Sequence, residues 1–464
     1  MGFRRCYRVQ VRPEKLELSR EEMRRLGYAV VDMLVEHFDS QAAGSPNGQP
    51  AASALDALAS EPLPEQGAPP DELLALLRDR VFAGTRRLDH PRFFAFVPSP
   101  GNFVSAMADA LASGFNAFAG TSHSGAGPTA IELATIDWMR RLCGFPDSTR
   151  GLFVSGGSSA NLTALAAARH TRLGYRIADA VAYFSDQTHS SVERAFRVLG
   201  FAPAQMRRIP CDQNFRLPLA ELAREVASDR SFGRTPFCVV ANAGTTSTGA
   251  VDPLRELADF CRAENLWLHA DGAYGAAAVL CDAGRLALDG LAEVDSLSLD
   301  PHKWLFQPFE IGCVLVRDGE KLKDTFLITA EYLRDVHRSH HQVNLCDYGI
   351  QLSRGFRALK LWLSLKVFGL DGFRQAVARG IALAETAERR LRRNPAWEIV
   401  SPAHLAVIAF RYADPALSAE QLEAVNRRLI DDMLTDSFAV LSSTVLHGRT
   451  TLRLCTINPR TTDE

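Results

Sequence analysis

Residues 237–273 read FCVVANAGTTSTGAVDPLRELADFCRAENLWLHADGA. Two short apolar runs, at 237–241 and 266–268, enclose a polar loop and a segment with helical spacing. Asp252 fits the N-cap of that helix, and Pro253 fits its first position. Apolar runs of strand length on both sides of a helix are typical of a parallel β-α-β unit. The stretch therefore predicts a mostly parallel sheet with helices on both faces.

The same alternation of apolar runs and helices continues on both sides of this stretch. We therefore expect the α/β fold class, with a large α/β domain over residues 86–356. A long helix followed by further strands predicts a small α+β domain over residues 357–464. Residues 1–85 contain a capping box, Ser19 and Glu22, and carry little apolar mass of their own. We expect this segment to be a helical arm that packs on a partner subunit.

The composition is that of an ordinary globular protein, with 47% hydrophobic and 23% charged residues among 464. A formal net charge of -2 supplies no field that would attract nucleic acid or an anionic membrane surface, so neither is an expected partner. The apolar runs fall short of the roughly 20 residues that span a bilayer. Nine scattered cysteines without a CxxC pair fit reduced thiols. Because the amino terminus also lacks the apolar core of a signal peptide, we expect a cytoplasmic protein.

Small polar residues follow the apolar run GLFV at 151–154 and lead directly into a helix. Gly157 and Ser158 lie in this turn, where backbone N–H groups and the helix N-terminus can bind an anion such as phosphate. The turn lacks the lysine of a P-loop and the spacing of GxGxxG. A plain strand-to-helix turn capped by serine fits it as well, so alone it does not decide for a phosphate site.

Three further polar residues come at the ends of predicted strands. His189 precedes a helix, where it could cap that helix or contact a ligand, and Thr246 lies on a glycine-containing loop. Asp271 ends a hydrophobic strand, and a buried carboxylate needs a partner because burial of a lone charge is costly. A protonated pyridine nitrogen would be such a partner, and capping of the next helix is the alternative.

Lys303 follows the apolar run SLSL at 296–299 and has Pro301, His302 and Trp304 as neighbours. A lysine that loses solvation in such a context can attack an aldehyde and form an imine, whereas a surface lysine is the alternative. The carboxyl ends of parallel strands meet at one edge of a sheet, so all these groups are expected to lie together. A phosphate loop, a stacking histidine, a strand-end aspartate and a lysine supply the contacts that hold pyridoxal 5'-phosphate (PLP).

The whole chain resembles the group II pyridoxal-dependent decarboxylases, the family of aromatic-L-amino-acid decarboxylase. The resemblance rests on the motifs DQTHSSVERA (186–195), HADGAYG (269–275), DPHKW (300–304) and SRGFRALKLW (353–362). It implies the fold-type I architecture of PLP enzymes, with an aspartate-aminotransferase-like large domain. It also implies a homodimer with exchanged amino-terminal arms, and the α-decarboxylation of an L-amino acid to an amine and carbon dioxide.

The resemblance implies a role for each cofactor contact. Lys303 would carry the cofactor as a Schiff base, and Asp271 would pair with the pyridine nitrogen. His189 and Ala273 would pack on opposite faces of the ring, with Thr246 near its hydroxyl group. The remaining implied positions are Gly157, Ser158 and Asp300 around the phosphate and His302 beside the lysine.

Tyr332 lies in LITAEYLRDVHRSHHQ, where the family has a mobile loop whose tyrosine returns a proton to Cα. Relatives that form aldehydes typically replace this tyrosine or alter the stacking histidine. Because the chain keeps Tyr332 and His189, decarboxylation is favoured over an aldehyde synthase, and a non-catalytic PLP-binding protein is disfavoured. Three histidines of the same segment lack a cysteine or acid to complete a metal site, so no metal is expected.

The segment HPRFFAFVPSP resembles the substrate-pocket wall of the family, with Phe94, Phe96 and Pro98 as its apolar residues. Ser353 lies where plant relatives that act on phenolic substrates tend to carry serine. The implied substrate is aromatic, similar to tyrosine, DOPA or tryptophan. Gly120 lies near the place where animal relatives have a bulky aromatic residue, so a non-aromatic substrate stays an alternative.

Overall fold

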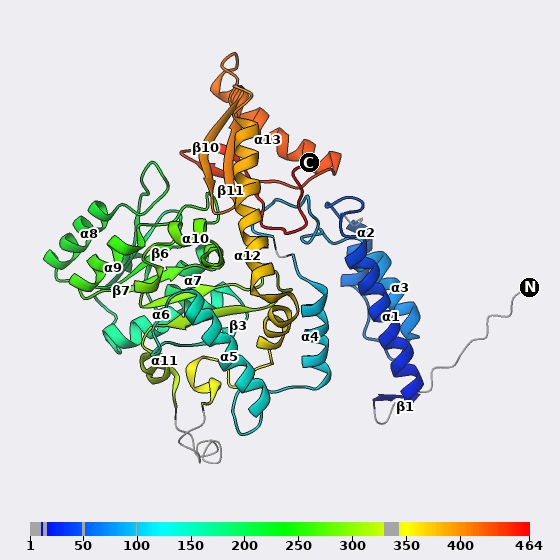
Figure 1. Ribbon diagram of the computed structural model, residues 1–464. Coiled ribbons are helices and arrows are strands. Elements are labelled where there is room, and N and C mark those ends of the chain that lie inside the picture. The colour runs from blue at the N-terminus through cyan, green and yellow to red at the C-terminus, as the bar shows by residue number, and fades with distance from the viewer. Residues whose placement is uncertain (1–10, 13–15, 49–51, 99, 329–342) are drawn as a thin grey trace, which may run out of the picture.

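The computed structural model describes residues 11–12, 16–48, 52–98, 100–328 and 343–464. Its largest sheet has the strand order β3-β9-β8-β7-β6-β4-β5 (Figure 1). Neighbouring strands are parallel, except that β9 runs antiparallel to β3 and to β8. The strands are β3 (Arg150–Val154), β4 (Ala180–Ser185), β5 (Met206–Ile209), β6 (Thr235–Asn242), β7 (Trp267–Asp271), β8 (Ser296–Leu299) and β9 (Gly312–Val316). The expected mostly parallel α/β sheet is confirmed.

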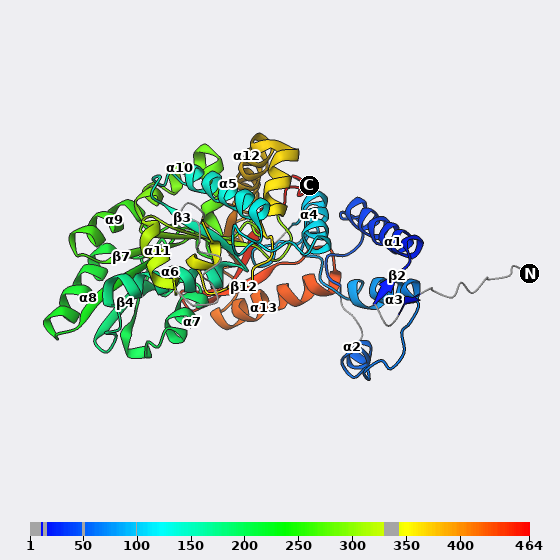
Figure 2. The same cartoon turned by 90° about the horizontal axis from the view of Figure 1, so that it is seen from below.

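Helices cover both faces of this sheet (Figure 2). Along β6, Val239 and Ala241 pack into one apolar cluster, while Cys238 and Val240 pack into the other. The first cluster includes residues of α5 (Ala126–Leu142), α8 (Leu219–Ser231) and α9 (Leu254–Ala263), and the second includes residues of α6 (Gly157–Leu173), α7 (Ser190–Val198) and α11 (Gly319–Phe326). Burial on both faces explains why the central strands are continuous apolar runs in the sequence.

Asp252 does not cap α9, contrary to the expectation from the sequence. The N-cap residue is Pro253, and the helix begins at Leu254. The carboxylate of Asp252 instead accepts hydrogen bonds from the backbone N–H groups of Leu217 (2.7 Å) and Asn242 (2.6 Å). These N–H groups are buried and need an acceptor, so they hold the carboxylate inside the fold.

The amino-terminal helices lie to one side of the body in both overall views. α1 (Arg20–Asp39) begins with the expected capping box of Ser19 and Glu22, and none of its described residues is buried. It is followed by α2 (Ala52–Ala59), α3 (Pro70–Leu76), a π-helix (Leu77–Phe82) and α4 (Phe103–Gly114). An amphipathic helix without a buried face leaves its apolar side chains exposed in the single chain.

A second sheet lies beside the first and has the antiparallel order β10-β11-β13-β12. The long helix α12 (Ala358–Leu391) leads to it and bends at Gly369, whose φ of 69° is left-handed. The other elements of this part are β10 (Trp397–His404), β11 (Val407–Tyr412), α13 (Ala419–Asp436), β12 (Ser442–Leu446) and β13 (Arg449–Cys455). The limits of the three expected domains, 1–85, 86–356 and 357–464, stay predictions.

Short elements complete the chain. They are β1 (Val11–Arg12), β2 (Glu17–Leu18), α10 (Asp282–Ala287) and 3-10 turns at Pro203–Gln205, Gly275–Leu280, Leu291–Glu293 and Leu345–Tyr348. Among the helices in the described ranges, none combines the length and the apolar character needed to cross a membrane.

Candidate active site

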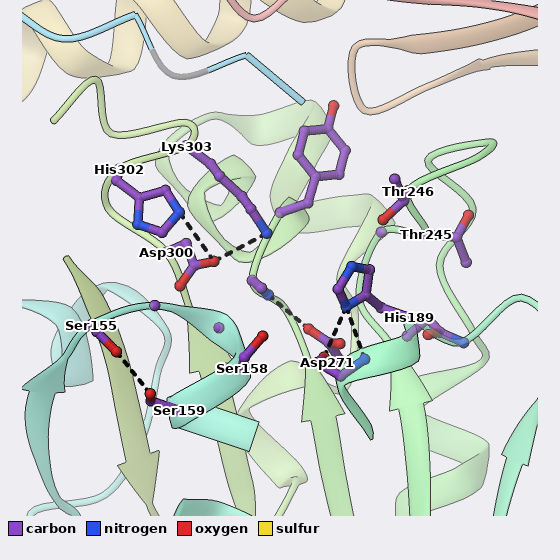
Figure 3. Close-up of a pocket in the computed structure, with 17 residues that line it drawn as sticks. Ser155, Ser158, Ser159, His189, Thr245, Thr246, Asp271, Asp300, His302 and Lys303 are labelled. Carbon is purple, nitrogen blue, oxygen red and sulfur yellow. Dashed lines mark hydrogen bonds and ion pairs between the residues drawn. The ribbon is translucent and has the colours of Figure 1, made fainter. Parts of the chain in front are cut away.

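A cavity of about 370 Å³ lies at the carboxyl ends of β3, β4, β6, β7 and β8. The residues that the sequence assigned to the cofactor all line it (Figure 3): Gly157, Ser158, His189, Thr246, Asp271, Ala273, Asp300, His302 and Lys303. Parallel strands end at the same edge of a sheet, which is why residues so far apart in the chain meet here. Their roles in cofactor binding stay predictions.

Lys303 extends into this cavity from the side opposite Asp271 and His189 (Figure 3). Its Nζ lies 3.0 Å from Oδ2 of Asp300, and Nε2 of His302 lies 3.6 Å from the same oxygen. Burial lowers the pKa of His302, which leaves its imidazole neutral near pH 7. Lys303 therefore has an ionic partner, in place of the purely apolar surroundings that its sequence neighbours indicated.

The turn between β3 and α6 approaches the cavity with its backbone. A Cβ on Gly157 would lie 2.8 Å from Oδ2 of Asp300 and 2.9 Å from the Cβ of Ala273, so glycine is required for this close packing. The first N–H groups of α6 have no acceptor within the helix, and they lie beside the cavity. The helix dipole adds a favourable potential for an anion at this point.

Asp271 ends β7 and is held by three hydrogen bonds. Its Oδ1 accepts from the backbone N–H of Ala273 (3.2 Å) and from Ser298 (3.1 Å), and its Oδ2 accepts from Nδ2 of Asn161 (3.0 Å). The residue is 7% exposed, so it is a nearly buried carboxylate whose accessible surface faces the cavity. His189 is the N-cap of α7, and its Nδ1 accepts the backbone N–H of Ser191 at 3.2 Å. The histidine thus caps a helix and faces the cavity at once.

The model of the pyridoxal-dependent decarboxylase conserved domain matches residues 53–413. The chain belongs to the pyridoxal-dependent decarboxylase family. An aromatic-L-amino-acid decarboxylase of Bacillus atrophaeus is 49% identical over 458 residues, which cover 97% of this chain and 94% of the relative. A phenylacetaldehyde synthase of Petunia hybrida is 29% identical over 466 residues, which cover 96% and 92%. The crystal structure of Oryza sativa TDC with PLP and tryptamine has a TM-score of 0.89 and 30% identity, covering 96% of this chain and 95% of that one.

The cavity of this PLP-dependent decarboxylase has the groups that its cofactor requires. Free backbone N–H groups at the α6 N-terminus, the Lys303 amine and the Asp271 carboxylate line it together, a set that fits a phosphate, an aldehyde and a protonated ring nitrogen. Asp300 differs from these groups because its carboxylate faces Lys303, and its Oδ1 is buried without a hydrogen-bond partner among the described residues. A carboxylate has no hydrogen to donate to a phosphate, so the contact that the sequence indicated for Asp300 stays a prediction.

The substrate-pocket role of Phe94, Phe96, Pro98 and Ser353 in the decarboxylase stays a prediction. Phe94, Phe96, Pro98 and Ser353 are not among the described residues that line the cavity. Phe96 is 58% exposed and its backbone N–H binds Oγ of Ser442, while Ser353 is also exposed. Tyr332 lies outside the described residues, as do the three histidines of its segment.

Several residues of the site were not found from the sequence. Asn161 contacts Asp271, and Ser191 contacts His189; an asparagine on the buried face of an otherwise apolar helix was the available signal. Arg453, which is not among the residues that line the cavity, is 3% exposed, and its Nε and Nη2 have no hydrogen-bond partner in the described part of the chain. Burial lowers the pKa of this guanidinium, and an arginine inside the apolar strand TLRLC was its signal.

Proposed function

We propose that this decarboxylase converts an aromatic L-amino acid to the corresponding amine and carbon dioxide. The observation that carries the proposal is a cavity in which Lys303, Asp271 and His189 face one another, in a chain 49% identical to an aromatic-L-amino-acid decarboxylase. Tyrosine, DOPA and tryptophan are amino acids of this aromatic class.

We assign a separate role to each residue of the cavity. When bound, PLP accepts the electron pair that remains on Cα as carbon dioxide leaves. Lys303 would hold the cofactor covalently, and the Asp271 carboxylate would keep a proton on its ring nitrogen. His189 and Ala273 would enclose the ring, and Thr246 would lie near its hydroxyl group. Gly157 and Ser158 present the α6 N-terminus to the phosphate, with Asp300 and His302 beside the lysine.

The product is expected to be an amine, because Tyr332 and His189 are both present. We assign to Tyr332 the return of a proton to Cα. An aldehyde synthase is the second candidate, since a phenylacetaldehyde synthase is 29% identical. It would consume oxygen and release ammonia and peroxide in addition to carbon dioxide. Phe94, Phe96, Pro98 and Ser353 are assigned to the substrate pocket.

We further propose a homodimer in which the amino-terminal arm packs on the partner subunit. Met23, Tyr28 and Val35 of α1 are 55%, 68% and 48% exposed, which is unusual for apolar residues unless another surface covers them. A cytoplasmic location is proposed as well. It is supported by the cysteines of the described ranges, all of which are free.

The decisive experiment measures amine, carbon dioxide, ammonia and peroxide together, after the protein with PLP is given a panel of L-amino acids. We expect equal amounts of amine and carbon dioxide from an aromatic amino acid, and an imine absorbance band before substrate is added. Lys303→Ala should abolish both, whereas Lys366→Ala, at an exposed position of α12, should change neither. Ammonia and peroxide would identify an aldehyde synthase, and the absence of an imine band would refute the proposal.

A further inference from the structure

A buried hydrogen-bond network lies behind the cavity and joins α6, α7, β7 and β8. Asn161 of α6 is at its centre and is 1% exposed. Its Oδ1 lies 2.9 Å from Nε2 of His269, and its Nδ2 lies 3.0 Å from Oδ2 of Asp271 and 2.9 Å from Oγ of Ser191. Asn161 is not among the residues that line the cavity, so it acts on the cavity through these neighbours.

The carboxylate of Asp271 fixes the orientation of this amide. A carboxylate accepts hydrogen bonds, so the nitrogen of Asn161 faces Asp271 and its oxygen faces His269, which must then donate from Nε2. Burial lowers the pKa of His269 to about 4, so the ring is neutral near pH 7 and its Nδ1 carries no proton. Nδ1 therefore accepts from Oγ of Ser296 at 2.9 Å, and that oxygen accepts from Nε1 of Trp267 at 2.9 Å.

The second N–H of the Asn161 amide is linked to the proton position on His189. It donates to Oγ of Ser191, whose own hydroxyl lies 2.8 Å from Nδ1 of His189. The backbone N–H of Ser191 also donates to Nδ1, at 3.2 Å. Because a backbone N–H can only donate, Nδ1 is an acceptor, and neutral His189 carries its proton on Nε2. The opposite edge of the ring faces the cavity (Figure 3).

We infer that Asn161 is a positioning residue that holds Asp271 as a hydrogen-bond acceptor and, through Ser191, His189 as the Nε2–H tautomer. One amide N–H keeps Asp271 in its accepting form, with Oδ2 occupied and the carboxylate plane fixed. The other N–H, through Ser191, leaves the Nε2–H of His189 available to a bound ligand. The inference rests on the proposed function for the identity of that ligand. It adds one residue, Asn161, whose amide contacts Asp271 directly and His189 through Ser191.

The test compares PLP with its 1-deaza analogue, in which carbon replaces the ring nitrogen. Dissociation constants of both are measured for the wild type, Asn161→Ala and the matched control Asn426→Ala. Asn426 is equally buried but lies in α13, where its amide binds carbonyl groups of Tyr412 and Leu422. Since a hydrogen bond to a charged group is lost, Asn161→Ala should weaken PLP about tenfold to a hundredfold, and the analogue less than about threefold. Asn426→Ala should leave both constants unchanged.

Equal weakening of PLP and the analogue, or no weakening of PLP, would overturn the role of Asn161. Failure of the wild type to bind PLP would refute the proposed function itself, so the two failures are distinguishable. A second measurement does not depend on the folding of any Asn161 variant. In nitrogen-15 spectra of wild-type protein labelled at histidine, His189 and His269 should both show the Nε2–H tautomer, assigned with His189→Gln and His269→Gln. The Nδ1–H tautomer on either ring would also overturn the inference.

Discussion

Replacement of Arg354 by methionine tests how much a buried ion pair near the site contributes to stability. The side chains of Arg354 and Glu132 are both 0% exposed, and their Nη2 and Oε1 atoms lie 2.5 Å apart. The guanidinium also donates to the backbone carbonyls of Ala119 (2.8 Å) and Phe153 (2.7 Å). The Arg354 side chain thus connects the segment that carries Ser353 to α5, to β3 and to the loop between α4 and α5.

The expected loss of stability depends on the partners that Glu132 keeps when methionine replaces Arg354. It fills most of the volume, but the Glu132 carboxylate keeps just one described partner, the backbone N–H of Phe153 at 2.9 Å. Breaking a buried pair in this way lowers the free energy of unfolding by about 3–5 kcal/mol. In the double variant Glu132→Gln and Arg354→Met no charge is buried, so we expect about 2 kcal/mol of that loss to be recovered.

Urea unfolding of the cofactor-free protein, followed by circular dichroism, measures these differences. Arg141→Met is the control, because Arg141 lies on the same helix as Glu132 but forms an exposed pair with Asp137, worth less than about 1 kcal/mol. The reasoning is refuted if Arg354→Met costs no more than Arg141→Met. It is equally refuted if the costs of the two single changes simply add in the double variant.

Three further outcomes are expected. Gly157→Ala should raise the PLP dissociation constant about tenfold or more, because the new Cβ would meet Asp300 and Ala273. Gly127→Ala, with open space around it, should leave the constant unchanged. Equal PLP binding by both variants would contradict the packing argument. The pKa of His269 is lowered from 6.5 to about 4, so between these values the unfolded chain binds a proton that the folded chain does not, and stability falls as the pH is lowered. The loss at pH 5 is about 2 kcal/mol, and an unchanged pH dependence of the urea midpoint in His269→Gln would exclude this source. Tyr28→Asp on α1 should convert the proposed dimer to a monomer in light scattering, whereas Tyr175→Asp, at a 90% exposed residue of the body, should leave it a dimer. A dimer in both variants would contradict the proposed arm contact.

The sequence predicted the parts of the fold that depend on short-range pattern. Continuous apolar runs such as those of β6 and β7 indicated buried parallel strands, and Ser19 with Glu22 indicated the start of α1. Once the strands were parallel, their ends had to meet, which is why Asp271 and Lys303 could be placed in one cavity.

The remaining features depend on contacts between distant segments. The role of Asn161 depends on the register of α6 against β7, which brings its amide to Asp271 and His269. The true partners of Asp252 lie on other segments of the chain, so its capping role could not be excluded from its neighbours. The hydrogen bond from the backbone N–H of Phe96 to Ser442 likewise joins segments that are far apart in the sequence.

The order of strands in the large sheet has a consequence for how the protein matures. β3, the first strand of that sheet to be synthesised, pairs with β9, the last one, and β9 in turn joins it to β8. The turn after β3 therefore takes its place in the sheet, next to the turn that carries Lys303, only through β9, which ends at Val316. A nascent chain that ends earlier can pair β8, β7, β6 and β4 with one another, but it lacks the strand that joins β3 to them. We therefore expect the complete cavity to form only after β9 is in place, and PLP that binds there to stabilise the closed sheet.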